Sequence, residues 1–227
     1  EELASQILAK GFAVMVQPFA SRIDDHGEIG TVLFDGVVSH LFRKAALLAA
    51  EATLGGALLT ANEVIPGRSD LVRKALAILP DVDVVTGDGV DIGLDQPNTY
   101  DRILLDAPCT GLGALRRRPE ARWRKSPKDV GDLTALQAQL LTSALHALKP
   151  GGVLAYVTCS PHLAETRAIV EGALRKNQNV SELDARAVLS DVAMETMDIA
   201  GDSLSVQLWP HRHGTDAMFI SLLTKSE

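Results

Sequence analysis

The chain has 227 residues, of which 46% are hydrophobic and only 4% aromatic, and its formal net charge at pH 7 is -7. This length favours one α/β domain with a sizeable core plus a small appendage. The negative charge argues against a protein that coats nucleic acid over its whole surface, but it leaves room for a local basic patch. No apolar stretch reaches the ~18 residues of a membrane span and no secretory signal is found, so we expect a cytoplasmic protein.

Helical and strand-like segments alternate from residue 41 onward. Helices are predicted over 41–53, 67–79, 133–148 and 163–176, and strands over 57–61, 82–86, 102–105, 153–157, 203–208 and 218–224. Turns rich in Gly, Pro and Asp separate these segments, which is typical of βαβ units. The last two strands have little between them, as is common at an antiparallel edge. We therefore expect an α/β fold with a mostly parallel, doubly wound sheet and an antiparallel C-terminal strand.

The only two cysteines of the chain, Cys109 and Cys159, each follow a short apolar run. Runs of this length, bounded by turn residues, are typical of buried parallel strands. In open α/β sheets, ligands bind beyond the carboxyl ends of the strands. If both runs are strands of one parallel sheet, both thiols lie at its ligand-binding edge, which suggests thiol chemistry on a bound substrate.

Other roles for the two cysteines agree less well with the sequence. A free cysteine is often a small buried core residue, but each of these is followed by Thr or Ser and then Gly or Pro. A metal site is not expected, because there is no C-x-x-C pair. A disulfide would require Cα atoms within roughly 7 Å and is not expected in a cytosolic chain.

Three acidic residues follow successive predicted strands: Glu63, Asp88 and Asp106. An acid after the second strand of such a sheet is well placed to bind ribose hydroxyls. Each acid alone is also explained as a helix cap or turn former. Three acids in corresponding positions favour a nucleoside-bearing cofactor.

A strongly basic segment, residues 116–125, lies between the two cysteines. Trp123 accompanies six basic residues in it: Arg116, Arg117, Arg118, Arg122, Arg124 and Lys125. Lys and Arg neutralise phosphates, and an aromatic ring can stack on an unpaired base. A charge run is often only a solvated face, but this one begins seven residues after Cys109. We therefore predict that it contacts RNA or DNA, with Trp123 either stacked on a base or anchored in the core.

Three segments of the chain resemble the Sun/Fmu/Nop-type RNA cytosine-5 methyltransferases. They are residues 106–113 (DAPCTGLG), 116–123 (RRRPEARW) and 156–160 (YVTCS). Paired Pro-Cys and Thr-Cys motifs are specific to RNA cytosine-5 methyltransferases as a class. The resemblance extends from about Lys44 to the end of the chain and includes residues 209–216.

This resemblance implies a Rossmann-like, class I S-adenosylmethionine-dependent methyltransferase fold. Residues 44–227 would form the catalytic domain. Residues 1–43 resemble the family only loosely, and we assign them no function beyond that of an N-terminal segment leading into this domain.

The resemblance also implies roles for individual residues. Cys159 would be the nucleophile that adds to carbon 6 of cytosine, which makes carbon 5 reactive toward a methyl group. Cys109 would help to resolve the adduct, and Asp106 would hold the base near the cofactor. The target cytosine must be unstacked, so we expect a looped or unfolded RNA, with ribosomal RNA favoured. The residues implied to contact S-adenosylmethionine are Glu63, Asp88, Asp106 and Lys44.

The Gly-rich cofactor loop of the family, of the form Asp-x-Cys-Ala-x-Pro-Gly-Gly-Lys, is not found in this sequence. Residues 35–44 stand at its position, with one residue too many and almost no glycine. Either the protein has lost the loop, or the sequence omits a segment at this point. The second explanation is favoured, because the divergence stops abruptly at Lys44, beside intact motifs.

We therefore expect an enzyme that methylates carbon 5 of cytosine in RNA. One alternative is a non-catalytic RNA-binding or ribosome-assembly protein that kept the fold but lost the cofactor loop, and it predicts no binding of S-adenosylmethionine. Another alternative is a small-molecule methyltransferase, which would give the basic segment no role.

Overall fold

The structure is a computed structural model that describes residues 48–50, 52, 56–77, 79, 82–124, 126–193 and 196–227. Of the helix predicted over 41–53, residues 48–50 and 52 are described, and they are helical. The predictions for residues 1–47 lie outside the described residues.

Two parallel strands, β1 (Leu59–Glu63) and β2 (Val82–Thr86), form a pair in which Glu63 lies opposite Thr86. The helix α4 (Pro66–Leu76) connects the two strands and packs on both. β2 has the predicted bounds, whereas β1 begins and ends two residues later than predicted. The shift makes Glu63 the last residue of the strand rather than a residue of the following turn.

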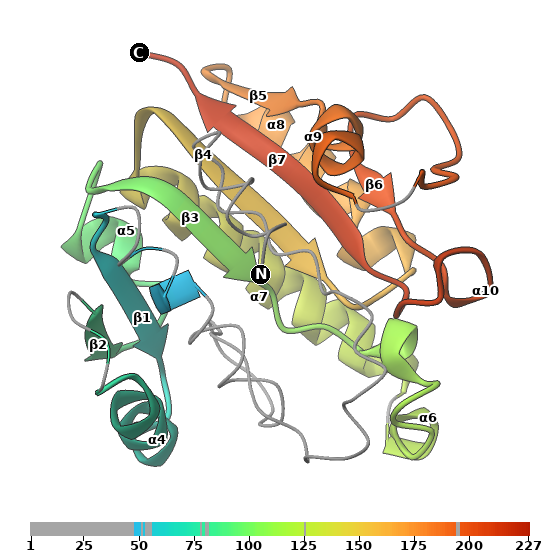
Figure 1. Cartoon of the computed structure of the whole chain (residues 1–227), viewed down its shortest axis with the longest axis horizontal. Coiled ribbons are helices and arrows are strands. Elements are labelled where there is room, and N and C mark those ends of the chain that lie inside the picture. The colour runs from blue at the N-terminus through green and yellow to red at the C-terminus, as the bar shows by residue number, and fades with distance from the viewer. Residues whose placement is uncertain are drawn as a thin grey trace.

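The larger sheet has the order β3 (Tyr100–Asp106), β4 (Leu148–Thr158), β7 (Phe219–Lys225) and β5 (Val180–Leu183), and β6 (Val206–Gln207) also pairs with β7. β3 and β4 are parallel, whereas β7 runs antiparallel to β4, β5 and β6 (Figure 1). The predicted antiparallel C-terminal strand is therefore confirmed.

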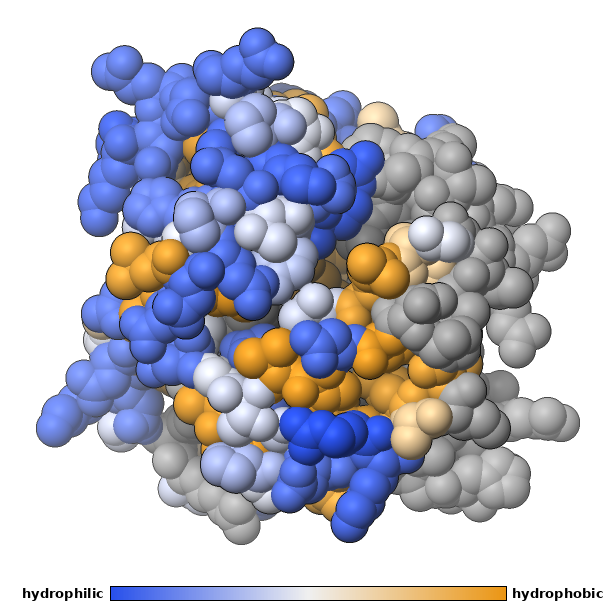
Figure 2. Space-filling view, turned by 90° about the vertical axis from the view of Figure 1, so that its left-hand side faces the viewer, coloured by the Kyte–Doolittle hydropathy of each residue, from blue (hydrophilic) through white to orange (hydrophobic). Residues whose placement is uncertain are grey.

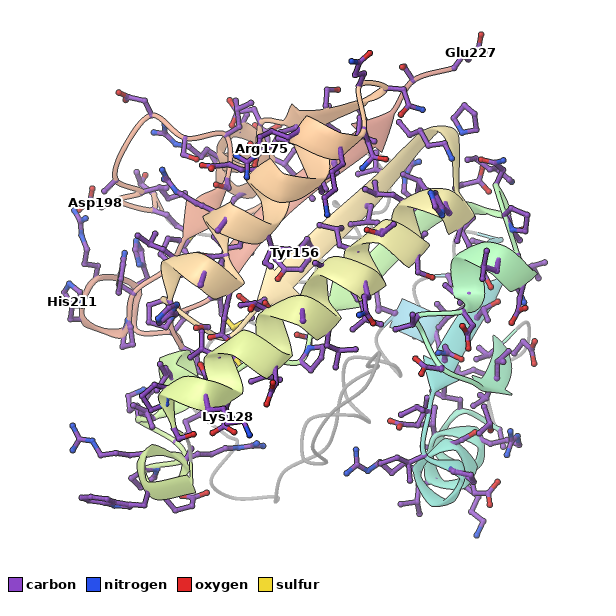
Figure 3. All side chains as sticks on the ribbon, turned by 180° about the vertical axis from the view of Figure 1, so that it is seen from behind. Lys128, Tyr156, Arg175, Asp198, His211 and Glu227 are labelled. Carbon is purple, nitrogen blue, oxygen red and sulfur yellow. The ribbon has the colours of Figure 1, made fainter. Side chains whose placement is uncertain are left out.

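Helices cover both faces of the larger sheet. Successive residues of β4 point to opposite faces and therefore pack against different helices. On one face, Leu154 and Tyr156 pack with α7 (Pro127–Ala147) and α8 (Arg167–Lys176), between which Tyr156 lies in Figure 3. On the other face, Ala155 and Val157 pack with α9 (Ala185–Val192). Burying an aliphatic side chain such as Leu154 contributes about 1.5–3 kcal/mol. The predicted α/β, doubly wound fold is confirmed.

Short helical turns occupy the connections around the sheet. They are α5 (Ile92–Asp95), η1 (Leu112–Ala114), α6 (Ala121–Arg124), η2 (Leu163–Glu165) and α10 (Pro210–His213). η1 and η2 follow the carboxyl ends of β3 and β4, and α10 precedes the start of the antiparallel β7. These three turns therefore lie at the same edge of the larger sheet.

The helix α7 begins six residues before the predicted start at residue 133, because its N-terminus is capped. The Ser126 backbone N–H donates to the Asp129 carboxylate at 2.6 Å, and Pro127 occupies the first helical position. Pro at this position removes only an N–H that has no partner within the helix. The prediction relied on the apolar pattern, which starts later than the cap.

Several other predicted bounds are wrong for local reasons. The helix predicted over 163–176 is interrupted at Thr166, where the backbone (φ -123°, ψ -103°) is not helical, and α8 begins only at residue 167. The strand predicted over 203–208 is reduced to the two residues of β6. β5 and α9 were not predicted. β5 has only four residues, two of them polar, so no apolar run marks it in the sequence.

No helix in the described part of the chain is long and apolar enough to cross a membrane. The side of the molecule formed by β1, α4 and α5 is a mixed surface, with apolar patches among polar side chains (Figure 2). Leu58, Leu71 and Leu94 are exposed on these elements or next to them.

Candidate active site

Cys109 and Cys159 follow two neighbouring parallel strands and meet at one edge of the sheet. β3 ends at Asp106 and β4 at Thr158, and their register places Asp106 opposite Val157. Both cysteines are half-buried, and their Sγ atoms lie 3.4 Å apart. The structure thus brings together the two thiols that the sequence placed at the ligand-binding edge.

The two sulfurs form a hydrogen-bonded pair of free thiols. A disulfide would bring them to about 2.05 Å. The contact with Cys159 is the largest cause that raises the pKa of the Cys109 thiol well above its ordinary value, followed by burial and by the Glu165 carboxylate. Cys109 therefore keeps its proton at neutral pH. Either sulfur of the pair can donate the hydrogen bond that joins the two thiols.

Gly113 joins the loop after β3 to the loop after β4 and to the start of β7. Its N–H donates to the Cys159 carbonyl at 2.9 Å, and its own carbonyl accepts from the Ala217 N–H at 3.0 Å. A Cβ at this position would stand 2.2 Å from the Ala217 carbonyl oxygen and 2.7 Å from that of Cys159. Only glycine allows this close approach of three backbone segments.

Glu63 is a buried carboxylate with an unused oxygen. Its side chain is at the end of β1, with 2% of the residue exposed. Oε1 accepts from the Ile65 N–H at 2.9 Å, whereas the buried Oε2 has no hydrogen-bond partner among the described residues. A buried acceptor normally has a donor, so a ligand hydroxyl such as that of a ribose fits this position.

The other predicted cofactor residues differ in their surroundings. Asp88 is exposed, and its carboxylate accepts from the Val90 N–H at 2.9 Å, as in a turn-forming Asp. Asp106 is 9% exposed at the end of β3, three residues before Cys109. Lys44 lies outside the described residues.

The basic segment leads away from Cys109 through η1 to α6. Arg116 and Arg122 are exposed and Arg118 is partly exposed. Trp123 is 84% exposed, so the prediction of a core anchor is wrong. The Arg124 side chain and Lys125 lie outside the described part of the structure.

Arg117, within the basic segment, is paired with a buried carboxylate of the protein. Its guanidinium donates from both Nε and Nη2 to the Asp216 carboxylate, which is 2% exposed. A bidentate pair of this kind is among the stronger charge-assisted contacts. Arg117 therefore joins the basic segment to the loop before β7.

Sequence reasoning missed Glu165, Gln137 and Asp216, which are buried side chains around this site. Glu165 falls in the first turn of the helix predicted over 163–176, and Gln137 falls in the helix predicted over 133–148. Asp216 lies in a segment that resembles the family, but no contact for it could be derived from the sequence. Long-range pairing through single polar side chains has no local sequence signal.

Comparisons with known proteins show that this chain is similar to methyltransferases. Rv1407 of Mycobacterium tuberculosis, which is named as a methyltransferase, is 50% identical over 182 residues, which are 80% of this chain and 38% of that protein. Ribosomal RNA small subunit methyltransferase F of Aeromonas hydrophila is 34% identical over 170 residues, 74% of this chain and 35% of that protein. The chain thus spans little more than a third of the length of these relatives.

The fold also occurs in a solved structure. The methyltransferase homolog protein from Pyrococcus horikoshii superposes with a TM-score of 0.65 at 22% identity, covering 99% of this chain and 82% of that one. The family described as 16S rRNA methyltransferase RsmB/F matches residues 44–224. The chain therefore belongs to the RsmB/F family of 16S rRNA methyltransferases.

Proposed function

We propose that the protein methylates carbon 5 of cytosine in ribosomal RNA by covalent cysteine catalysis, in the cytoplasm and with S-adenosylmethionine as methyl donor. The observation that carries this proposal is the 3.4 Å approach of the Cys109 and Cys159 sulfurs at the carboxyl ends of β3 and β4. Membership of the RsmB/F family supports the methyl donor and ribosomal RNA as substrate. We assign the catalytic domain to residues 44–227.

The chemistry needs a nucleophile, because carbon 5 of cytosine is too poor a nucleophile to take a methyl group directly. The Cys159 thiolate adds to carbon 6, and the displaced electron pair makes carbon 5 enamine-like. S-adenosylmethionine supplies the methyl group when it is bound. A water molecule then accepts the proton of carbon 5, and the electron pair of that C–H bond expels Cys159 as a thiolate. Cys109 is close enough to Cys159 to assist this last step.

The described residues suit this cofactor. The unused oxygen of Glu63 would accept from a ribose hydroxyl, and Asp88 follows the neighbouring strand of the same pair. Asp106 would hold the base on the side of Cys109. The exposed arginines after Cys109 and the indole of Trp123 would contact phosphates and a base of the RNA.

A methyl-transfer assay tests the role of Cys159. With protein expressed from the complete gene, Cys159→Ala should abolish transfer of labelled methyl groups to RNA. The affinity for S-adenosylmethionine, measured by calorimetry, should not change, because the nucleophile contacts the base rather than the cofactor. Full transfer by the variant would refute the assignment.

A further inference from the structure

Glu165 is a fully buried carboxylate that contacts both the loop containing Cys109 and the loop containing Cys159. It belongs to η2, six residues after Cys159, and none of its surface is exposed. An ionised carboxylate is rarely buried unless other groups compensate its charge. The contacts of its two oxygens therefore indicate why it is placed there.

Three of the hydrogen bonds to the Glu165 carboxylate come from the residues that directly follow the two cysteines. Oε1 accepts from the Thr110 N–H at 2.7 Å, and Oε2 accepts from the Thr110 hydroxyl at 2.6 Å. Oε2 also accepts from the Ser160 hydroxyl at 2.6 Å. One carboxylate thus holds the residue after Cys109 and the residue after Cys159.

A second buried side chain, Gln137, completes this set of contacts. We call Glu165, Thr110, Ser160 and Gln137 together the clamp. Gln137 of α7 donates from Nε2 to Glu165 Oε1 at 3.4 Å and to the Pro108 carbonyl, directly before Cys109, at 2.7 Å. The Tyr156 hydroxyl donates to the Glu165 carbonyl at 2.9 Å. The clamp is therefore anchored on α7 and on β4, which belong to the rigid core.

We propose that Glu165 is a positioning residue that sets the separation of the Cys109 and Cys159 sulfurs. The sulfurs must be close enough to share a proton, yet neither belongs to a helix or strand that would fix it. The hydrogen bonds from Thr110 and Ser160 to one carboxylate supply this constraint. The proposal rests on the proposed function for the roles of the sulfurs, but the spacing itself is testable without RNA or cofactor.

The test uses phenylarsine oxide, whose arsenic binds two thiols together and releases water. Tight binding requires both sulfurs within reach of one arsenic atom, since the second As–S bond forms intramolecularly. The parent protein should bind one equivalent. Glu165→Ala should weaken binding by roughly tenfold or more, while iodoacetamide still alkylates each cysteine singly.

Glu165→Gln separates geometry from charge. Its amide oxygen can accept from the Thr110 N–H, and its amino group can donate to the hydroxyls of Thr110 and Ser160 after these rotate. This variant should therefore keep most of the arsenical affinity. Glu171→Ala is the matched control, because Glu171 is an exposed glutamate on α8, and it should bind as the parent does.

Two results would overturn the proposal. One is parent-like arsenical affinity in a folded Glu165→Ala protein, and the other is equal loss in the Ala and Gln variants. If Glu165→Ala does not fold, Ser160→Ala decides, because it frees only the Cys159 loop and should still weaken binding. Arsenical results as expected without any methyl transfer by the parent would refute the proposed function and leave the positioning role standing.

Discussion

At the scale of single residues, the surroundings distinguish groups of the same type. The contact with Cys159, burial and the Glu165 carboxylate together raise the pKa of the Cys109 thiol. The three acids after the strands differ. Glu63 and Asp88 each accept from a backbone N–H, but Glu63 is buried and its Oε2 has no partner among the described residues, whereas Asp88 is exposed. Residue identity alone did not separate these cases.

This difference predicts unequal effects on cofactor binding. Glu63→Ala should weaken the affinity for S-adenosylmethionine by about 1–3 kcal/mol, the usual cost of leaving a buried polar partner unsatisfied. Asp88→Ala should weaken it less, because Asp88 is exposed. Calorimetry on protein from the complete gene measures both. An unchanged dissociation constant for Glu63→Ala would show that Glu63 forms a turn and does not contact the cofactor.

At the scale of elements, Gly113 predicts a stability effect at the junction of two loops and β7. Gly113→Ala should lower the free energy of unfolding by about 1–3 kcal/mol or more, as overpacking does, because its Cβ would stand against two carbonyl oxygens. Gly131→Ala is the control, since a Cβ there meets nothing within 4 Å on α7. That change should be neutral or stabilising, as Ala is the better helix former. Equal denaturation midpoints for both variants would contradict this account.

The basic segment predicts two separable effects. Replacing the exposed Arg116 and Arg122 by Ala should weaken RNA binding and make its salt dependence shallower, since each lost phosphate contact removes about 0.7 from the slope for single strands. Arg117→Ala should mainly lower stability, because it leaves the buried Asp216 unpaired. Binding isotherms at several salt concentrations and thermal unfolding distinguish the two. A parent-like salt slope in the double variant would end the case for this face as the RNA contact.

The elements themselves were predictable where the sequence pattern is local. The apolar runs before Asp106 and Cys159 gave β3 and β4, and the turns around β2 gave its bounds. The start of α7 was missed because its cap, Ser126 with Asp129, lies outside the apolar pattern. The pairing of Arg117 with Asp216 joins positions 99 residues apart, and the clamp at Glu165 likewise depends on tertiary structure. The sequence therefore indicated which side chains gather at the site but not how they are held.

At the scale of the whole molecule, one edge of the sheet collects the groups that the proposed reaction needs. Strands β3 and β4 bring the two sulfurs together, and the basic segment with its exposed arginines begins seven residues after Cys109. The net charge of the chain is -7, which disfavours phosphate binding over the whole surface, whereas the local basic segment is suited to it. The matched residues cover 38% of a relative such as Rv1407, so the activity of the whole protein is best measured on the product of the complete gene.

The most direct test of the proposed covalent catalysis is to incubate the folded protein with RNA and S-adenosylmethionine. The intact mass of the protein is then measured under denaturing conditions. Cys109→Ala should accumulate a covalent protein–RNA adduct, because Cys159 still adds to the base while resolution is impaired. Cys159→Ala and the double variant should show none. An adduct that persists without Cys159, or no adduct in Cys109→Ala, would contradict the assignment of the two sulfurs.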